Sequence, residues 1–143
     1  MSHLKNKESL NYPEVGFLTE NSSQSLAIED LKALMKQIED YVVGSESFMS
    51  AELTIIDLAE KLKVHPKRIS TAINTVIKQN FNTYINQHRI NKAERLLKNK
   101  SAENFSIEGI GKEVGFNSKS AFYSAFKKYT GMTPSAYKES TAV

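Results

Sequence analysis

The sequence has no cysteine and no tryptophan among its 143 residues. Without cysteine the protein has no disulfide framework, no zinc site built on thiolates and no cysteine nucleophile. The longest apolar runs are only a few residues, far short of the ~20 that a membrane-spanning helix needs. The first 15 residues also lack the apolar stretch of a secretory signal. These absences predict a cytoplasmic protein that makes no membrane contact through this segment.

The net charge of +3 conceals an uneven distribution along the chain. Residues 1–50 carry 4 Lys+Arg against 8 Asp+Glu, a balance of −4, whereas residues 51–143 carry 15 against 8, a balance of +7. A basic segment of this kind indicates binding to a polyanion. We therefore expect an N-terminal arm with an acidic connector helix over 1–50 and a basic domain over 51–143.

Apolar residues recur every three or four positions along most of the chain, which predicts helices, and no strand pattern is present. Residues 1–25 are polar and predict an arm, and the stripe from Ile28 to Val42 predicts an amphipathic helix over about 26–43. Capping preferences mark the other helix starts. These starts are Thr54, His65 followed by Pro66, Ser106, Asn117 or Ser118, and Thr133. Residues 80–82, NFN, interrupt the pattern, and a long helix is expected after them from about Thr83 to Lys98.

The pattern of residues 58–64, LAEKLKV, recurs at 110–116 as IGKEVGF, and each copy is followed by another helix. A short helix, a tight turn and a second helix form the helix-turn-helix plan. The first helix of each unit needs a small residue where the two helices cross, and Ala59 and Gly111 supply it.

The turn of each unit favours a residue that tolerates a positive φ. Gly115 meets this demand in the second unit. Lys63 stands there in the first, at a cost of about 1 kcal/mol if it is left-handed. Val64 and Phe116 then fill the gap between the helices.

Four segments carry a resemblance to a known family. They are LTIIDLA at 53–59, YINQHRINKAERLL at 84–97, VGFNS at 114–118 and FKKYTGMTPSAY at 126–137. Residues 53–137 resemble the DNA-binding domain of the AraC/XylS regulators, and the last segment matches that family's signature.

The resemblance implies an all-α fold with two helix-turn-helix subdomains, at 51–80 and 105–130, joined by a linker helix at 82–99 and preceded by the extra amphipathic helix. It also implies sequence-specific binding of double-stranded DNA and transcription regulation, with a recognition helix of each unit in the major groove. By position, the base-facing residues are Lys67, Ser70, Thr71, Lys119, Ser120, Tyr123 and Ser124. The phosphate-contacting residues are His65, Arg68, Asn74, Asn117, Lys127 and Lys128.

Two departures from the family keep other functions open. Many members carry Arg where this chain has Thr71 and Ser124, and Arg is the commonest bidentate partner of guanine. A non-specific architectural DNA binder therefore remains an alternative, as does a helical module for protein interaction or dimerisation. The further partners that the resemblance allows are RNA polymerase and an N-terminal sensor domain in a longer parent chain.

No constellation of catalytic or metal-binding residues accompanies the helices. The histidines His3, His65 and His88 are scattered without HExxH spacing, and no nucleophile motif is present. We expect no enzyme activity, no metal and no cofactor.

Overall fold

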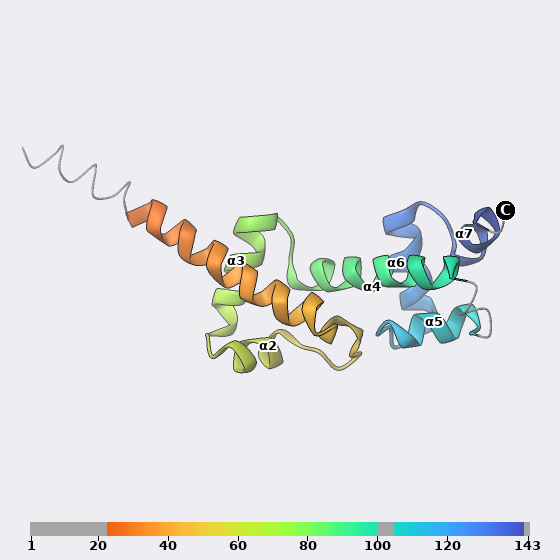
Figure 1. Cartoon of the computed structure of the whole chain (residues 1–143), viewed down its shortest axis with the longest axis horizontal. Coiled ribbons are helices and arrows are strands. Elements are labelled where there is room, and N and C mark those ends of the chain that lie inside the picture. The colour runs from red at the N-terminus through yellow and green to blue at the C-terminus, as the bar shows by residue number, and fades with distance from the viewer. Residues whose placement is uncertain (1–22, 100–104, 142–143) are drawn as a thin grey trace, which may run out of the picture.

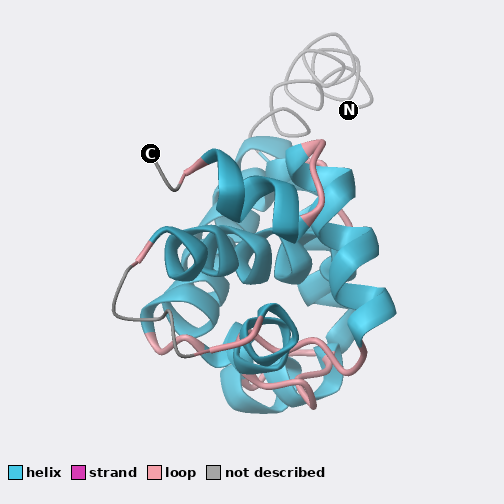
Figure 2. Cartoon of the chain, turned by 90° about the vertical axis from the view of Figure 1, so that its right-hand side faces the viewer, coloured by secondary structure: helices cyan, strands magenta, loops and turns pink. Residues whose placement is uncertain are grey.

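The computed structural model describes residues 23–99 and 105–141, and every element in these ranges is a helix or a loop (Figure 2). Residues 23–39 form an α-helix that continues as a π-helical turn over Asp40–Gly44, followed by a 3-10 turn at Ser47–Met49. The remaining helices are α2 (Ile55–Leu62), α3 (Pro66–Ile77), α4 (Phe81–Lys98), α5 (Ile107–Glu113), α6 (Lys119–Thr130) and α7 (Pro134–Ser140). The prediction of an all-α fold is confirmed. No helix in the described ranges is long and apolar enough to cross a membrane.

Residues 23–44, the N-terminal helix, lie along the first helix-turn-helix unit and extend beyond it at their N-terminal end (Figure 1). Leu31, Leu34 and Ile38 are buried, as their spacing predicts. Ile28, which the spacing predicts in the same stripe, is 44% exposed. All of residues 23–30 are exposed, and burial begins at Leu31. The helix already includes residues 23–25, which we had assigned to a polar arm. The rest of that predicted arm lies outside the described residues.

Side-chain caps explain where the helices of the first unit begin. Thr54 and Asp57 form a reciprocal capping box, in which the Thr54 hydroxyl accepts from the Asp57 amide at 3.1 Å and the Asp57 carboxylate accepts from the Thr54 amide at 2.9 Å. At the start of α3, the Nδ1 atom of His65 accepts from the Lys67 amide at 3.0 Å. Both starts agree with the prediction.

The start of α4 differs from the prediction, and the start of α6 decides between two candidates. The Asn80 side chain accepts from the Thr83 amide at 2.8 Å, so α4 begins at Phe81, two residues before the expected start. For α6, the Ser118 hydroxyl accepts from the Ala121 amide at 3.1 Å, which makes Ser118 the cap rather than Asn117.

The buried apolar side chains form two separate cores, one for each helix-turn-helix unit. The first unites the N-terminal helix, α2, α3 and the beginning of α4, and the second unites the end of α4 with α5, α6 and α7. The α4 helix contributes Tyr84 and Ile85 to the first core and Ile90, Ala93 and Leu97 to the second. A single helix of about 27 Å therefore links both units.

The two turns have the backbone conformation that their sequences predict. Lys63 is left-handed with φ 58°, and Gly115 has φ 115°. Gly111 lies against Phe122, where a Cβ atom would come within 2.6 Å of the Phe122 ring, so the helix crossing requires the absent side chain. One left-handed residue, Lys78 with φ 56°, ends α3 without a glycine signal and was not predicted.

Candidate nucleic-acid interface

The α3 helix presents one continuous polar face to solvent. Ile69, Ala72 and Ile73 are buried in the first core, and this places Lys67, Ser70, Thr71 and Asn74 on the outer side. All four outer residues are exposed, and their i, i+3, i+4, i+7 spacing aligns them along the helix. They line an open hollow of about 380 Å³ together with Thr75, Asn80 and Phe81.

The α6 helix presents an equivalent face. Its buried residues are Phe122, Ala125 and Phe126, and its outer residues are Ser120, Tyr123, Ser124 and Lys127. Tyr123 is partly buried because its ring packs edge-on against Phe122, with 5.9 Å between ring centroids. The hydroxyl and amine groups of the others remain available to a ligand.

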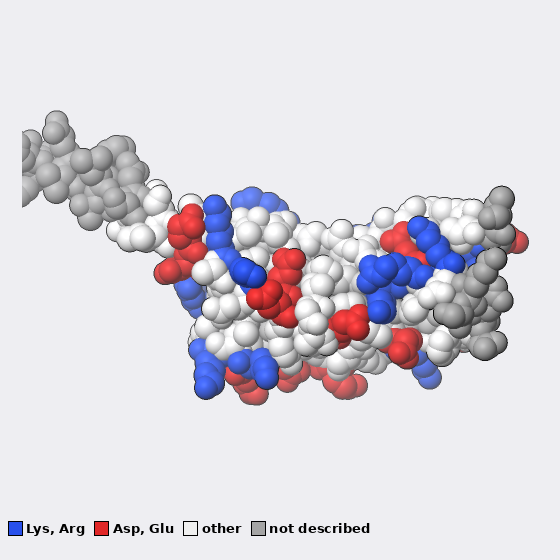
Figure 3. Space-filling view, viewed as in Figure 1, with Lys and Arg blue, Asp and Glu red and all other residues white. Residues whose placement is uncertain are grey.

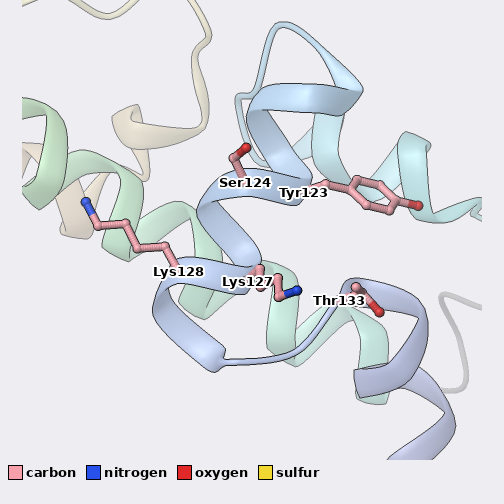
Figure 4. Close-up of a pocket in the computed structure, with 5 residues that line it drawn as sticks. All are labelled: Tyr123, Ser124, Lys127, Lys128 and Thr133. Carbon is pink, nitrogen blue, oxygen red and sulfur yellow. The ribbon is translucent and has the colours of Figure 1, made fainter.

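A second hollow, of about 430 Å³, follows the exposed face of α6. Figure 4 shows Tyr123 and Lys127 extending to the same side of α6, with Thr133 at the far edge, whereas Lys128 extends the opposite way. The Lys128 amine lies 5.7 Å from the Tyr129 ring centroid. Lys127 and Lys128 both line this hollow, together with Tyr123, although the two lysine side chains extend in opposite directions.

The two exposed faces correspond position by position. Lys67, Ser70, Thr71 and Asn74 stand 53 residues before Ser120, Tyr123, Ser124 and Lys127. The buried pairs that hold the helices in place share this offset, so the same faces are turned outward for the same reason. Figure 1 shows α3 and α6 near opposite ends of α4, each running across the long axis of the molecule. Two matched polar helix faces on one connecting rod are suited to bind an extended, repeating ligand.

Some predicted contact residues already have partners within the protein. The Lys119 amine lies 3.2 Å from the Glu108 carboxylate and 5.4 Å from the Tyr123 ring centroid, with both charged side chains 60% exposed. His65 uses Nδ1 as a helix cap and leaves Nε2 available. Arg68 and Asn117 are exposed beside the starts of α3 and α6.

The sequence did not reveal the residues that border the two hollows from outside α3 and α6. Asn80 and Phe81 flank α3, and Thr133 flanks α6. Asn80 and Thr133 are both residues that favour an N-cap position. This preference predicted a helix start at Thr133, but it did not reveal that Thr133 borders the exposed face of α6. On the face shown in Figure 3, which bears the N-terminal helix, acidic and basic side chains are interspersed. The excess of Lys and Arg side chains in residues 51–143 does not gather into a single basic patch on this face.

Residues 58–140 match the family model described as a helix-turn-helix domain. The fold and the two exposed helices thus define a DNA-binding protein of the helix-turn-helix class. Within that class, the chain belongs to the AraC family of transcription regulators. This family and the relatives described below are transcription regulators, which are not enzymes.

The chain is 38% identical over 87 residues to the melibiose operon regulatory protein of Escherichia coli K12, which covers 61% of this chain and 28% of that protein. It is 26% identical over 110 residues to the transcriptional regulator AlkR of Acinetobacter baylyi, covering 76% and 35%. The chain thus spans about a third or less of the length of these relatives.

Two solved structures share the fold. The C-terminal domain of AraT, a response regulator from Geobacillus stearothermophilus, is 29% identical, with a TM-score of 0.67 over 76% of this chain and 85% of that one. The C-terminal domain of the two-component response regulator yesN from Fusobacterium nucleatum is 27% identical, with a TM-score of 0.65 over 74% and 98%.

Proposed function

We propose that α3 and α6 enter successive major grooves on one face of a DNA duplex and read two half-sites about one helical turn, or roughly 34 Å, apart. The observation that carries this proposal is the matched pair of exposed faces at a constant offset of 53 residues. Because both faces belong to one chain, a monomer reads both half-sites. The two faces carry different side chains, so the two half-sites have different sequences. The proposal places this binding in the cytoplasm.

Within this proposal, the outer side chains divide into base readers and phosphate contacts. Lys67, Ser70 and Thr71 read bases from α3, and Lys119, Ser120, Tyr123 and Ser124 read bases from α6. Each good contact contributes roughly 1–3 kcal/mol of discrimination between bases. Phosphate contacts come from His65, Arg68, Asn74, Asn117, Lys127 and Lys128, and they set the register and the salt dependence.

The geometry of His65 supports its assignment as a phosphate contact. Its Nδ1 atom accepts a hydrogen bond from the backbone, so in the neutral ring the proton is on Nε2. An Nε2–H group beside the first turn of α3 is a donor suited to a phosphate oxygen. The proposal extends to RNA polymerase as a partner and to a sensor domain in a longer parent chain.

Selection of bound duplexes from a random pool tests the mechanism. The expected result is an enriched pair of motifs about one helical turn apart. Enrichment of no sequence, with equal binding of all duplexes, would instead assign the protein to the non-specific architectural binders. No binding at low salt together with a stable dimer in solution would favour the protein-interaction module.

Alanine variants separate the base readers from the phosphate contacts. Lys67→Ala should change the preferred sequence in one half-site only. Lys127→Ala should weaken binding to all duplexes and reduce the slope of log affinity against log salt by about 1. Lys36→Ala is the matched control, because the Lys36 side chain is 77% exposed on the N-terminal helix and lines neither hollow. If Lys67→Ala weakened every sequence equally, its role as a base reader would be wrong.

A further inference from the structure

Arg89 lies at the point where α4 passes from one core to the other. Ile85 belongs to the first core and Ile90 to the second, and Arg89 falls between them in the sequence. Its side chain is partly buried, and this burial lowers the pKa of the guanidinium below its ordinary value. The cost of burying a charge has to be offset by hydrogen bonds.

Those hydrogen bonds go to the segment that follows the N-terminal helix, residues 46–50. The Arg89 Nε atom donates to the Phe48 carbonyl oxygen at 2.6 Å, and an Nη atom donates to the Ser50 carbonyl oxygen at 2.8 Å. The planar guanidinium presents its donors in a fixed fork, so two bonds define an orientation and not only a distance. Phe48 itself is buried in the first core.

The turn of the second helix-turn-helix unit packs against the same guanidinium. A Cβ atom on Gly115 would come within 2.6 Å of the Arg89 Nε atom, 2.9 Å of the Phe48 carbonyl oxygen and 3.0 Å of the Met49 carbonyl oxygen. The Phe116 ring lies over the guanidinium, with its centroid 5.7 Å from Cζ. Three segments distant in the sequence, 46–50, α4 and 115–116, therefore meet at Arg89.

An ion pair one turn further along α4 strengthens the same junction. The Lys92 amine lies 2.9 Å from the Glu46 carboxylate, and the Lys92 side chain is only 25% exposed. Glu46 has the left-handed conformation, φ 55°, where the chain leaves the N-terminal helix. Lys92 and Arg89 are three residues apart and so lie on the same side of α4.

We infer that Arg89 is a positioning residue that sets the orientation of the second recognition helix relative to the first, by clamping residues 46–50 between α4 and the Gly115 turn. The two cores are otherwise separate. Without the clamp, only the stiffness of α4 between Ile85 and Ile90 would hold the two units in a fixed relative orientation. The clamp adds a second connection on one side of that rod. It also connects the N-terminal helix to the second unit through residues 46–50, so movement of this helix would alter the spacing of α3 and α6.

Distance measurements on the free protein test the clamp directly. Because the chain has no cysteine, Ser70→Cys and Ser124→Cys introduce spin labels only on the exposed faces of α3 and α6. Pulsed dipolar spectroscopy should give a narrow distance distribution for this protein and a broadened or shifted one after Arg89→Met. Arg95→Met is the matched control, because Arg95 is an exposed residue of α4 outside the junction, and it should leave the distribution unchanged. An unchanged distribution in folded Arg89→Met would overturn the inference.

A conservative variant covers the case in which Arg89→Met does not fold. Arg89→Lys keeps the positive charge and the aliphatic stem but has a single amine in place of the fork. It should also broaden the distribution, by less than Arg89→Met. A distribution as narrow as that of the parent protein would show that the fork is not needed, and the clamp would be rejected.

The consequence for DNA binding rests on the proposed function. Insertion of one base pair between the two selected motifs should lower the affinity of the wild-type protein by about tenfold or more, because one helix loses its base contacts. In Arg89→Met the same insertion should cost less than about threefold, because a looser junction adapts. An equal loss in both proteins would refute the clamp. If the wild-type protein bound equally well with and without the inserted base pair, the two-groove function would be rejected instead. The distance measurements on the free protein would still test the clamp.

Discussion

Replacement of Gly115 by alanine should destabilise the protein more than the same change at Gly131. Both glycines have positive φ, 115° and 79°, so alanine at either site is strained, at a cost of about 1–3 kcal/mol. The two sites differ in the space that is available to a Cβ atom. A Cβ atom at Gly131 meets nothing within 4 Å, whereas at Gly115 it meets the Arg89 Nε atom at 2.6 Å and two backbone carbonyl oxygens at 2.9 and 3.0 Å.

The crowding at Gly115 adds to the strain because backbone carbonyls cannot move aside as a flexible side chain can. Overpacking of this kind costs about 1–3 kcal/mol, so Gly115→Ala should lose about 2–6 kcal/mol of unfolding free energy and Gly131→Ala about 1–3. Urea unfolding followed by far-ultraviolet circular dichroism measures both values. Gly44→Ala, with open space and no positive φ, is the neutral control. The reasoning is refuted if Gly115→Ala loses no more stability than Gly131→Ala.

Two further predictions concern the cores. Gly111→Ala places a Cβ atom 2.6 Å from the buried Phe122 ring and should cost up to about 2 kcal/mol after the gain in helix propensity. In a Phe122→Leu background most of this cost should vanish, and additive losses in urea unfolding would contradict the contact. Burial, opposed by Glu39 and assisted by Arg95, lowers the pKa of His88. The unfolded chain then binds more protons, so stability should fall as the pH drops below ~6.5. His88→Gln should weaken this dependence between pH 7.5 and 5, and an unchanged slope would count against it.

Local rules were sufficient to predict most helix starts. The cap at Ser106 is one example, since its hydroxyl accepts from the Gly109 amide at 2.9 Å. The capping box at Thr54 and the glycine end of α6 at Gly131 are others. Each depends on side chains and amides within four residues of one another, so the information is contiguous in the sequence. The predicted start of α4 is two residues late because residues 80–82 were assigned to the break before the helix, and only the hydrogen bond to the Thr83 amide identifies Asn80 as the cap.

The exposed faces of α3 and α6 were also predictable, because the burial of Ile69, Ile73, Phe122 and Phe126 follows from their spacing. The contacts that each exposed side chain makes were less predictable. Lys119 lies next to an acidic residue of α5, and Lys128 lies over the ring of Tyr129. These differences depend on rotamers and on neighbours from other helices, which spacing within one helix does not describe.

The sequence by itself determined the helices, their caps, the repeated units and the family, because periodicity, capping and turn preferences act over a few residues. The tertiary structure alone decided how the units are joined. The Arg89 guanidinium binds carbonyl oxygens 41 and 39 residues away, and every residue has such an oxygen. No side-chain pattern marks those acceptors. Only the folded chain brings residues 46–50, α4 and the Gly115 turn together, and this junction connects the units that carry α3 and α6.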